Sequence, residues 1–454
     1  MDVAPNDIVT ITIKDLAYGG RGIGKINGFV IFVPGTVPGD VIRARIIKRK
    51  SNHASAELVD IQTPSPLRLT PPCPHFGKCG GCTWQNIPYK HQLVFKEQIL
   101  KTTLEHLGAQ KDLAMQPVIP SPEIWHYRNK MDFTFGTSST GQVTLGFHKE
   151  GSYLDIIDIK KCFIHPKIFN TILQILREEV NRQQLTSYDP QTHEGFLRHL
   201  IVREGKQTGN IIITLLTTAA DTLAIEPLAA ALRQQIPDIT GLIWGIHSGV
   251  ADVARLDRIA YQDGDSQIEE HLDSLRFLIS PSSFFQTNTL AAQQLYTVVK
   301  QMADLSKKDV LLDAYCGIGP IGLFCSDSVK TVIGIELEVE AIWDARRNAA
   351  LNNLTNCTFI AGEVRKVLPT VLSSIADSIT RIIVDPPRSG MDKKTLRHLL
   401  ELKAPVLAYV SCNPTTLARD LIVITNAGYR IDAIQPIDMF PHTYHIETVA
   451  RFIL

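Results

Sequence analysis

Residues 310–322 read VLLDAYCGIGPIG, an apolar run that ends at a glycine-rich turn. The run is typical of a buried strand, and Gly317, Gly319 and Gly322 form a G-x-G-x-x-G pattern where the next helix would open. Glycines there let the backbone bend tightly and approach a ligand closely. Glu336 ends the next expected strand, where its carboxylate could accept two ribose hydroxyls. NAD and S-adenosylmethionine (SAM) sites share this layout, and a plain packing turn is the alternative.

Strands and helices alternate through the rest of this half of the chain. We expect strands over 310–316, 332–336, 357–363, 382–385 and 406–412, and helices near 338–353, 393–402 and 415–426. This alternation indicates a parallel sheet with helices on its faces. It defines a Rossmann-like α/β domain over residues 281–454.

Residues 1–62 predict a separate small β-barrel. Apolar and polar residues alternate over 8–13, Pro34-Gly35 stops a second run over 29–33, and a third run covers 41–47. The third run and the residues after it are basic, with Arg43, Arg45, Lys48, Arg49 and Lys50. They form either a patch that follows a nucleic-acid backbone or an ordinary solvated face.

A central α+β unit over 63–280 completes a multidomain chain. A proline-rich linker opens it at 63–72, a helix is expected over 89–107, and strands dominate 125–280. The length of 454 residues is consistent with roughly three domains.

Composition excludes several protein classes. The N-terminus has no basic stretch followed by an apolar run, and no apolar run approaches about 18 residues, so we expect a cytoplasmic protein with no membrane span. The formal net charge is zero, which neither favours nor excludes nucleic-acid binding, because local patches decide it. The 8 cysteines are too few for a disulfide scaffold and point to metal binding or catalysis.

Asp385 stands at the end of an expected strand and precedes two prolines. Each proline fixes φ and restricts the residue before it, so Asp385-Pro386-Pro387 leaves the sheet as a rigid, extended segment. We therefore expect the Asp385 carboxylate in the crevice where open α/β sheets bind ligands.

Three cysteines gather in ten residues, at Cys73, Cys79 and Cys82, and Cys162 offers a fourth thiol downstream. Four thiolates can hold zinc or an iron–sulfur cluster. The spacing differs from the usual three-cysteine radical-SAM pattern. The residues alone leave zinc and iron–sulfur open.

Cys412 ends an apolar run and precedes Asn413-Pro414, while Glu447 lies near the C-terminus. A strand-end thiol and a nearby carboxylate could serve as nucleophile and base. An ordinary thiol has a pKa of about 8.5, so a nucleophilic role requires local activation.

Taken together, these motifs resemble the RNA uridine-5-methyltransferases, specifically the iron–sulfur type that acts on ribosomal RNA. The resemblance covers nearly the whole chain and rests on five segments in order: Phe284-Phe285-Gln286, Asp313–Gly319, Asp385–Arg388, Ser411–Pro414 and His445–Thr448. It implies that residues 1–62 are a TRAM domain, a small RNA-binding barrel. It also implies that the helix over 89–107 packs on the catalytic domain.

The resemblance implies a role for each matched residue. Cys412 would be the nucleophile and Glu447 the general base. The remaining roles are SAM binding by Gln286, Tyr315, Gly317, Gly319, Glu336, Glu363 and Asp385, uracil contact by Gln286 and Asp385, and ligation of a [4Fe–4S] cluster by Cys73, Cys79, Cys82 and Cys162. The expected function is methyl transfer from SAM to C5 of a uridine in 23S ribosomal RNA, by a monomer.

Five other functions share some of these features. A transfer-RNA uridine-5-methyltransferase differs only in its substrate, and a cytosine-5-methyltransferase would also use a cysteine. A methyltransferase acting on an exocyclic amine would not need Cys412. A non-catalytic TRAM-type RNA-binding protein would need none of the catalytic set, and a nicotinamide enzyme leaves Cys412 and Asp385 unexplained.

Overall fold

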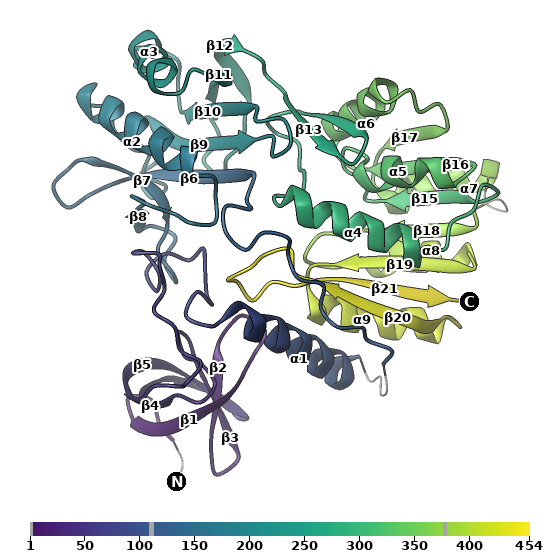
Figure 1. Cartoon of the computed structure of the whole chain (residues 1–454), viewed down its shortest axis with the longest axis horizontal. Helices are drawn as coiled ribbons and strands as arrows, with labels where there is room; N and C mark the ends of the chain where they lie inside the picture. Colours follow the sequence, from purple (N-terminus) through teal and green to yellow (C-terminus); the bar gives the residue numbers. More distant parts are fainter. Residues whose placement is uncertain (1–2, 109–112, 376–378) are drawn as a thin grey trace.

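The computed structural model describes residues 3–108, 113–375 and 379–454, with the backbone alone for 371–375. Met1 and Asp2 of the N-terminal stretch discussed above lie outside these ranges. Figure 1 shows an N-terminal barrel (purple), a central sheet (blue to teal) and a C-terminal sheet (green to yellow). Helix α1 (Tyr89–Leu107) lies between the barrel and the C-terminal sheet, where it contacts α9 (Pro414–Asn426) and β1.

The N-terminal barrel is closed in the order β1-β2-β3-β5-β4. Along β1, Ile11 and Ile13 point into the core while Thr10 and Thr12 face outward, as the alternation predicts. Its strands are β1 (Ile8–Leu16), β2 (Gly22–Ile26), β3 (Phe29–Val33), β4 (Val41–Arg49) and β5 (His53–Thr63).

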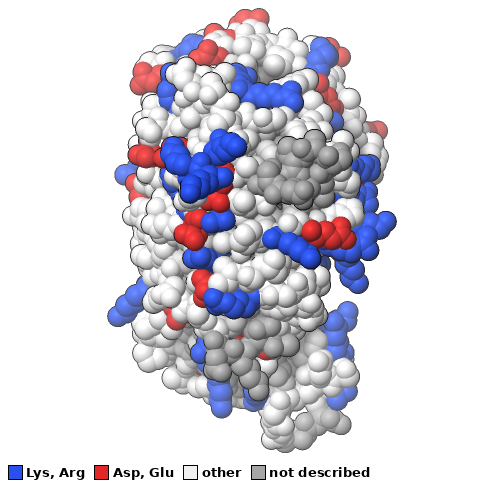
Figure 2. Space-filling model, turned by 90° about the vertical axis from the view of Figure 1, so that its right-hand side faces the viewer, with Lys and Arg blue, Asp and Glu red and all other residues white. Residues whose placement is uncertain are grey.

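The basic strand β4 is partly neutralised by its neighbour. Arg43 pairs with Asp60, and Arg45 lies 3.5 Å from the Glu57 carboxylate, both on β5. Arg49 stacks over the Phe29 ring. The sequence shows the cluster of cations but not the acids placed opposite two of them, so the patch carries less free positive charge than its composition indicates. On the face drawn in Figure 2, Lys and Arg are likewise interspersed with Asp and Glu.

The central sheet has seven strands in the order β12-β11-β10-β9-β6-β7-β8. Among the described residues of this sheet, β10 and β11 pair in parallel and all other neighbouring strands pair antiparallel. Helices α2 (Lys167–Arg182) and α3 (Ile225–Gln235) contribute to its buried core. The strands are β6 (Lys130–Thr137), β7 (Val143–His148), β8 (Ile156–Asp158), β9 (Leu197–Glu204), β10 (Ile211–Thr217), β11 (Ile239–Ile246) and β12 (Arg258–Gly264).

The C-terminal sheet has the order β17-β16-β15-β18-β19-β21-β20, in which β21 is antiparallel to both neighbours. The other pairs are parallel, as the alternation of strands and helices predicts. The strands are β15 (Val310–Ala314), β16 (Thr331–Glu336), β17 (Cys357–Ala361), β18 (Arg381–Val384), β19 (Val406–Ser411), β20 (Arg430–Ile437) and β21 (Glu447–Ile453).

Helices cover both faces of this sheet, so the predicted α/β layering is confirmed. One buried cluster includes α4 (Thr289–Met302), α5 (Pro320–Cys325) and α6 (Val339–Leu351). The other includes α7 (Val364–Ile375), α8 (Lys393–Glu401), α9 and the separate helix α1.

A hairpin precedes the C-terminal sheet and packs against helices that cover it. Strands β13 (Ile268–Leu272) and β14 (Leu275–Ile279) share a core with α4 and α6. A cut at residue 280 therefore separates the hairpin from the helices that it contacts. None of the described helices is long and apolar enough to cross a membrane.

Candidate active site

The carboxyl ends of five parallel strands bring the expected site residues to one edge of the sheet. This follows from topology, since parallel strands end on the same side and open sheets bind ligands there. Figure 1 shows these ends facing the central sheet and the loop before β21. The residues are Tyr315 after β15, Glu336 in β16, Glu363 after β17, Asp385 after β18 and Cys412 after β19.

Glu447 reaches the same edge from the opposite direction. It begins β21, which runs antiparallel to β19 with Ser411 opposite Thr448. Continuing that register by one residue sets Cys412 opposite Glu447. Cross-strand neighbours have Cβ atoms about 4.5–5.5 Å apart. The proposed nucleophile and base, distant in sequence, are thus adjacent because of the antiparallel strand.

The glycine-rich turn closes on Glu336. The Gly317 amide donates to a Glu336 carboxylate oxygen at 3.1 Å, and the Leu337 amide donates to the other at 2.6 Å. Gly319 has a φ of 81°, and a Cβ there would lie 2.9 Å from the Phe359 ring. A Cβ on Gly317 would meet no described atom within 4 Å. The turn therefore packs tightly on one side and stays open on the other, where a nucleoside could approach.

Two motifs are joined at the next strand ends. Asn413 caps α9 by accepting from the Thr415 amide at 3.0 Å, and its Nδ2 donates to the Arg388 carbonyl at 3.0 Å. The Asp385–Arg388 segment is thereby fixed to the loop that carries Cys412. Sequence shows the two motifs but not this bond.

Burial is the main cause of the pKa shifts of Cys412, Asp385 and Glu447. It raises the pKa of Cys412 to about 12, with Glu447 and Asp385 adding to the effect and Arg388 opposing it. Burial raises the pKa of Asp385 to about 7 and that of Glu447 well above its usual range. All three groups lose charge where water is excluded. A cation bound at this edge would favour their ionised forms.

Gln286 is buried and Phe284 is exposed, both in the loop between β14 and α4. The side-chain amide of Asn129, in the central domain, donates to the backbone carbonyl of Gln286 at 3.0 Å and to the Thr289 hydroxyl at 2.8 Å. Phe284, two residues earlier, is 69% exposed. The central domain therefore fixes the backbone of this loop and leaves an aromatic ring facing solvent.

Glu363 is at the expected edge, but its carboxylate turns away toward its own helix. It pairs with Arg365 and Lys366, which hold the pKa of this acid below its usual range. The described structure does not join Glu363 to Gly317 or Glu336 by a hydrogen bond.

The loop before Glu447 is held by segments from far upstream. The Thr83 and Trp84 amides both donate to the His442 carbonyl at 3.0 Å. Gln92 of α1 contacts His442 twice, through the His442 amide at 2.8 Å and the ring at 3.1 Å. Lys96 of α1 forms a fully buried ion pair with Asp438 at 2.6 Å. These positioning residues were missed from the sequence, because no local pattern marks such distant contacts.

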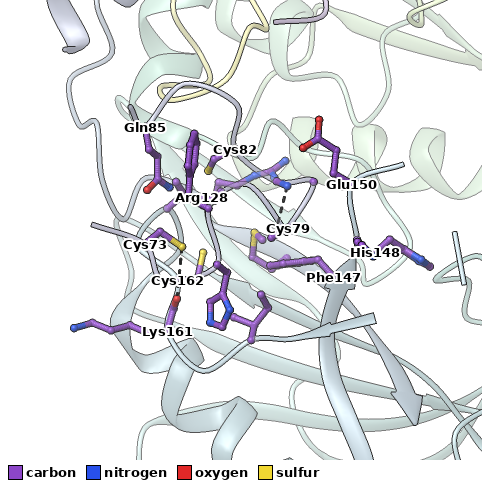
Figure 3. Close-up of a pocket in the computed structure, with 18 of the residues that line it drawn as sticks. Cys73, Cys79, Cys82, Gln85, Arg128, Phe147, His148, Glu150, Lys161 and Cys162 are labelled. Carbon is purple, nitrogen blue, oxygen red and sulfur yellow. Dashed lines mark hydrogen bonds between the residues drawn. The ribbon is translucent and has the colours of Figure 1, made fainter. Parts of the chain in front are cut away.

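The four cysteines of the central domain surround one cavity of about 430 Å³ (Figure 3). The sequence identifies these four cysteines as candidates, and the structure shows that Cys73, Cys79, Cys82 and Cys162 all line this cavity. Backbone amides also point at the sulfurs: the Gly81 amide lies 3.4 Å from Cys79 Sγ. Burial raises the pKa of Cys79 to about 11 and that of Cys82 to about 12, so the free thiols are neutral.

Within the described residues, no group of three or more His, Cys, Asp or Glu side chains is arranged to hold a metal ion. A single zinc ion needs ligands converging to about 2.3 Å. The four thiols line a cavity and do not converge in this way.

Comparison with known proteins agrees with the geometry. The TRAM domain matches residues 3–59, and the family described as tRNA (Uracil-5-)-methyltransferase matches residues 88–452. An uncharacterized RNA methyltransferase of Caldanaerobacter subterraneus is 37% identical over 98% of this chain and 99% of its own. An uncharacterized RNA methyltransferase of Listeria monocytogenes is 37% identical over 98% of this chain and 97% of its own length.

A solved structure extends the likeness to the whole fold. The Pyrococcus abyssi tRNA (uracil-54, C5)-methyltransferase, in complex with S-adenosyl-L-homocysteine, has a TM-score of 0.77 and 29% identity, over 98% of this chain and 100% of that one. The sheet and its edge thus define a SAM-dependent RNA methyltransferase with an N-terminal TRAM barrel. The chain belongs to the tRNA (uracil-5-)-methyltransferase family.

Proposed function

We propose that this enzyme methylates C5 of a uridine in 23S ribosomal RNA through a covalent adduct with Cys412. The observation that carries the proposal is the strand register that sets Cys412 opposite Glu447 at the ligand edge. An enzyme that methylates an exocyclic amine has no use for this thiol and carboxylate. Methylation at C5 of a pyrimidine ring uses both groups, because a nucleophile must add to C6 and a base must remove the C5 proton.

The chemistry follows from the weak nucleophilicity of uracil C5. The Cys412 thiolate adds to C6, and the ring becomes an enolate with electron density at C5 and O4. SAM supplies the methyl group, which C5 accepts. Glu447 then removes the C5 proton, the C5–C6 double bond re-forms, and Cys412 leaves C6.

The remaining edge residues would hold the two substrates. We assign Glu336, Gly317, Gly319 and Tyr315 to the nucleoside of SAM. Their support is the Gly317–Glu336 contact and the open side of the turn. We retain Glu363 in this set on the strength of its strand end alone. Asp385 follows the strand next to the one that carries Cys412, and its charge acts on that thiol, so we assign it to both SAM and uracil. We give Gln286 the same role on the resemblance alone.

The choice of RNA rests on the four-cysteine set, which resembles the ribosomal-RNA type. Transfer RNA is the second candidate, because the solved relative is a transfer-RNA methyltransferase. Unmodified 23S and transfer RNA transcripts, each incubated with the purified chain and labelled SAM, distinguish them. We expect 5-methyluridine in 23S RNA, mapped by mass spectrometry. Label confined to transfer RNA would replace the substrate, and no label in either would overturn the function.

We also propose that Cys73, Cys79, Cys82 and Cys162 hold a [4Fe–4S] cluster. The support is one cavity lined by all four thiols, with backbone amides directed at the sulfurs. Bound iron would favour the thiolates that burial disfavours in its absence. Such a cluster would cross-link the segment before Thr83 to the central sheet, a structural contribution rather than a catalytic one.

The cluster predicts a brown protein after anaerobic purification, with about four iron atoms per chain. Cys82→Ser should bleach the protein and lower its iron content, because it removes one ligand. Cys357→Ser is the matched control, since this partly buried thiol lies in the other sheet. A colourless protein with one zinc per chain would refute the cluster.

For the domain organisation we propose divisions near residues 62 and 280, with α1 assigned to the catalytic part. We further propose that the chain acts as a monomer, since one chain supplies every residue of the site described above.

A further inference from the structure

The turn between β1 and β2 of the barrel reaches the catalytic loop. It spans 17–21 and is closed by bonds from the Ala17 amide to the Arg21 carbonyl at 2.8 Å and from the Gly20 amide to the Ala17 carbonyl at 3.0 Å. Trp84 Nε1 donates to the Gly20 carbonyl at 3.4 Å. A Cβ on Gly20 would lie 3.3 Å from the Tyr444 ring. The barrel is thus docked against the loop that carries Glu447.

Three aromatic rings line up at this junction. Tyr18 meets Tyr444 edge-on with ring centroids 5.4 Å apart, and Tyr444 meets His445 at 4.2 Å. All three side chains remain partly exposed. Neither hydroxyl has a hydrogen-bond partner among the described residues, and the same holds for the His445 ring. Rings with free polar atoms, accessible to solvent, are what protein sites use to stack and hydrogen-bond unpaired bases.

This aromatic row lies beside the catalytic groups. His445 is two residues before Glu447 in the chain. Burial raises the pKa of Tyr18 to about 12. The nearby Tyr444, Cys412 and Glu447 add to this rise, and Arg388 opposes it. The phenol therefore keeps its proton at neutral pH and can donate a hydrogen bond.

We propose that Tyr18 of the barrel, together with Tyr444, forms a wall of the RNA site that stacks on a nucleotide next to the target uridine. This inference rests on the proposed function. A uridine that enters the Cys412 site must leave its base stack, and its neighbours then expose their faces. The barrel would supply a replacement stacking surface at the point of entry. Its role is one of positioning.

Tyr18→Ala tests the proposal in the full-length protein, with the RNA transcript that the wild type methylates. Loss of one stacked base is expected to raise the KM for RNA by about tenfold to a hundredfold. Tyr18→Phe keeps the ring and should restore most of this loss. Ile8→Ala is the matched control, because it truncates an exposed side chain at the far end of β1, the strand that leads into the turn with Tyr18.

Two further readouts separate RNA contact from a merely structural role. If Tyr18 only supported the Tyr444 loop, Tyr18→Ala would also change SAM affinity and the rate at which iodoacetamide alkylates Cys412. We expect both to stay at wild-type values. In transcripts carrying 4-thiouridine, ultraviolet light should cross-link RNA to the peptide that contains Tyr18.

Two results would overturn the inference: an unchanged KM in Tyr18→Ala, or cross-links found only on the outer strands of the barrel. Failure of the wild type to methylate any transcript would instead refute the proposed function.

Discussion

Alanine in place of Cys412 abolishes methyl transfer to RNA while SAM still binds. The expected loss is on the order of 10⁶-fold, as for other covalent nucleophiles, since no other described group stands opposite Glu447 to attack C6. The substitution removes one partly buried sulfur at a strand end, away from the turn between Gly317 and Glu336. Transfer of label from SAM to RNA measures the loss, and titration calorimetry measures SAM affinity.

Cys357→Ala is the control for this experiment. Cys357 is also partly buried in the same sheet, but it begins β17, whose start lies away from the ligand edge. It should retain activity. Measurable turnover by Cys412→Ala would exclude the covalent mechanism and favour direct methylation.

Glutamine in place of Glu447 is expected to trap the enzyme on its RNA. The amide matches the carboxylate in size but cannot accept the C5 proton, so the methylated adduct cannot collapse. Turnover should fall by roughly 10²- to 10⁴-fold, the usual contribution of a positioned base. On a denaturing gel, label from SAM should migrate with a protein–RNA band.

The matched control is Glu401→Gln, an exposed glutamate at the end of α8. It should turn over normally and leave no adduct. The double variant Glu447→Gln with Cys412→Ala should also give no band, because no thiol remains to form it. Full activity in Glu447→Gln, without an adduct, would remove Glu447 as the base.

Local pattern predicted the elements of the catalytic sheet well. The apolar runs at 310–316 and 406–412 correspond to β15 and β19, because a buried parallel strand needs continuous apolar sequence. The barrel also followed from alternation, although the expected runs leave out the strand over 22–26. Three of its five residues, Gly22, Gly24 and Lys25, are of types with low strand propensity.

The site could be predicted only where residues lie at strand ends. Motif order named Cys412 and Asp385, but the adjacency of Cys412 and Glu447 depends on an antiparallel register that no local pattern encodes. Tyr18, Gln92 and Lys96 were missed for a similar reason, since their partners lie in the loop over 438–446. The direction of the Glu363 side chain was equally inaccessible, because it depends on competition between a ligand and two nearby cations.

The Lys96–Asp438 pair has a consequence for how the protein is made. Its partners are 342 residues apart, and both side chains are fully buried. A chain emerging from the ribosome exposes Lys96 long before Asp438 is synthesised, and domains generally fold in the order of synthesis. The Lys96 cation of helix α1 is paired only after the segment that contains Asp438 has been synthesised. The loop over 438–446 therefore joins helix α1 late in folding. A polypeptide that ends before this loop would not gain activity.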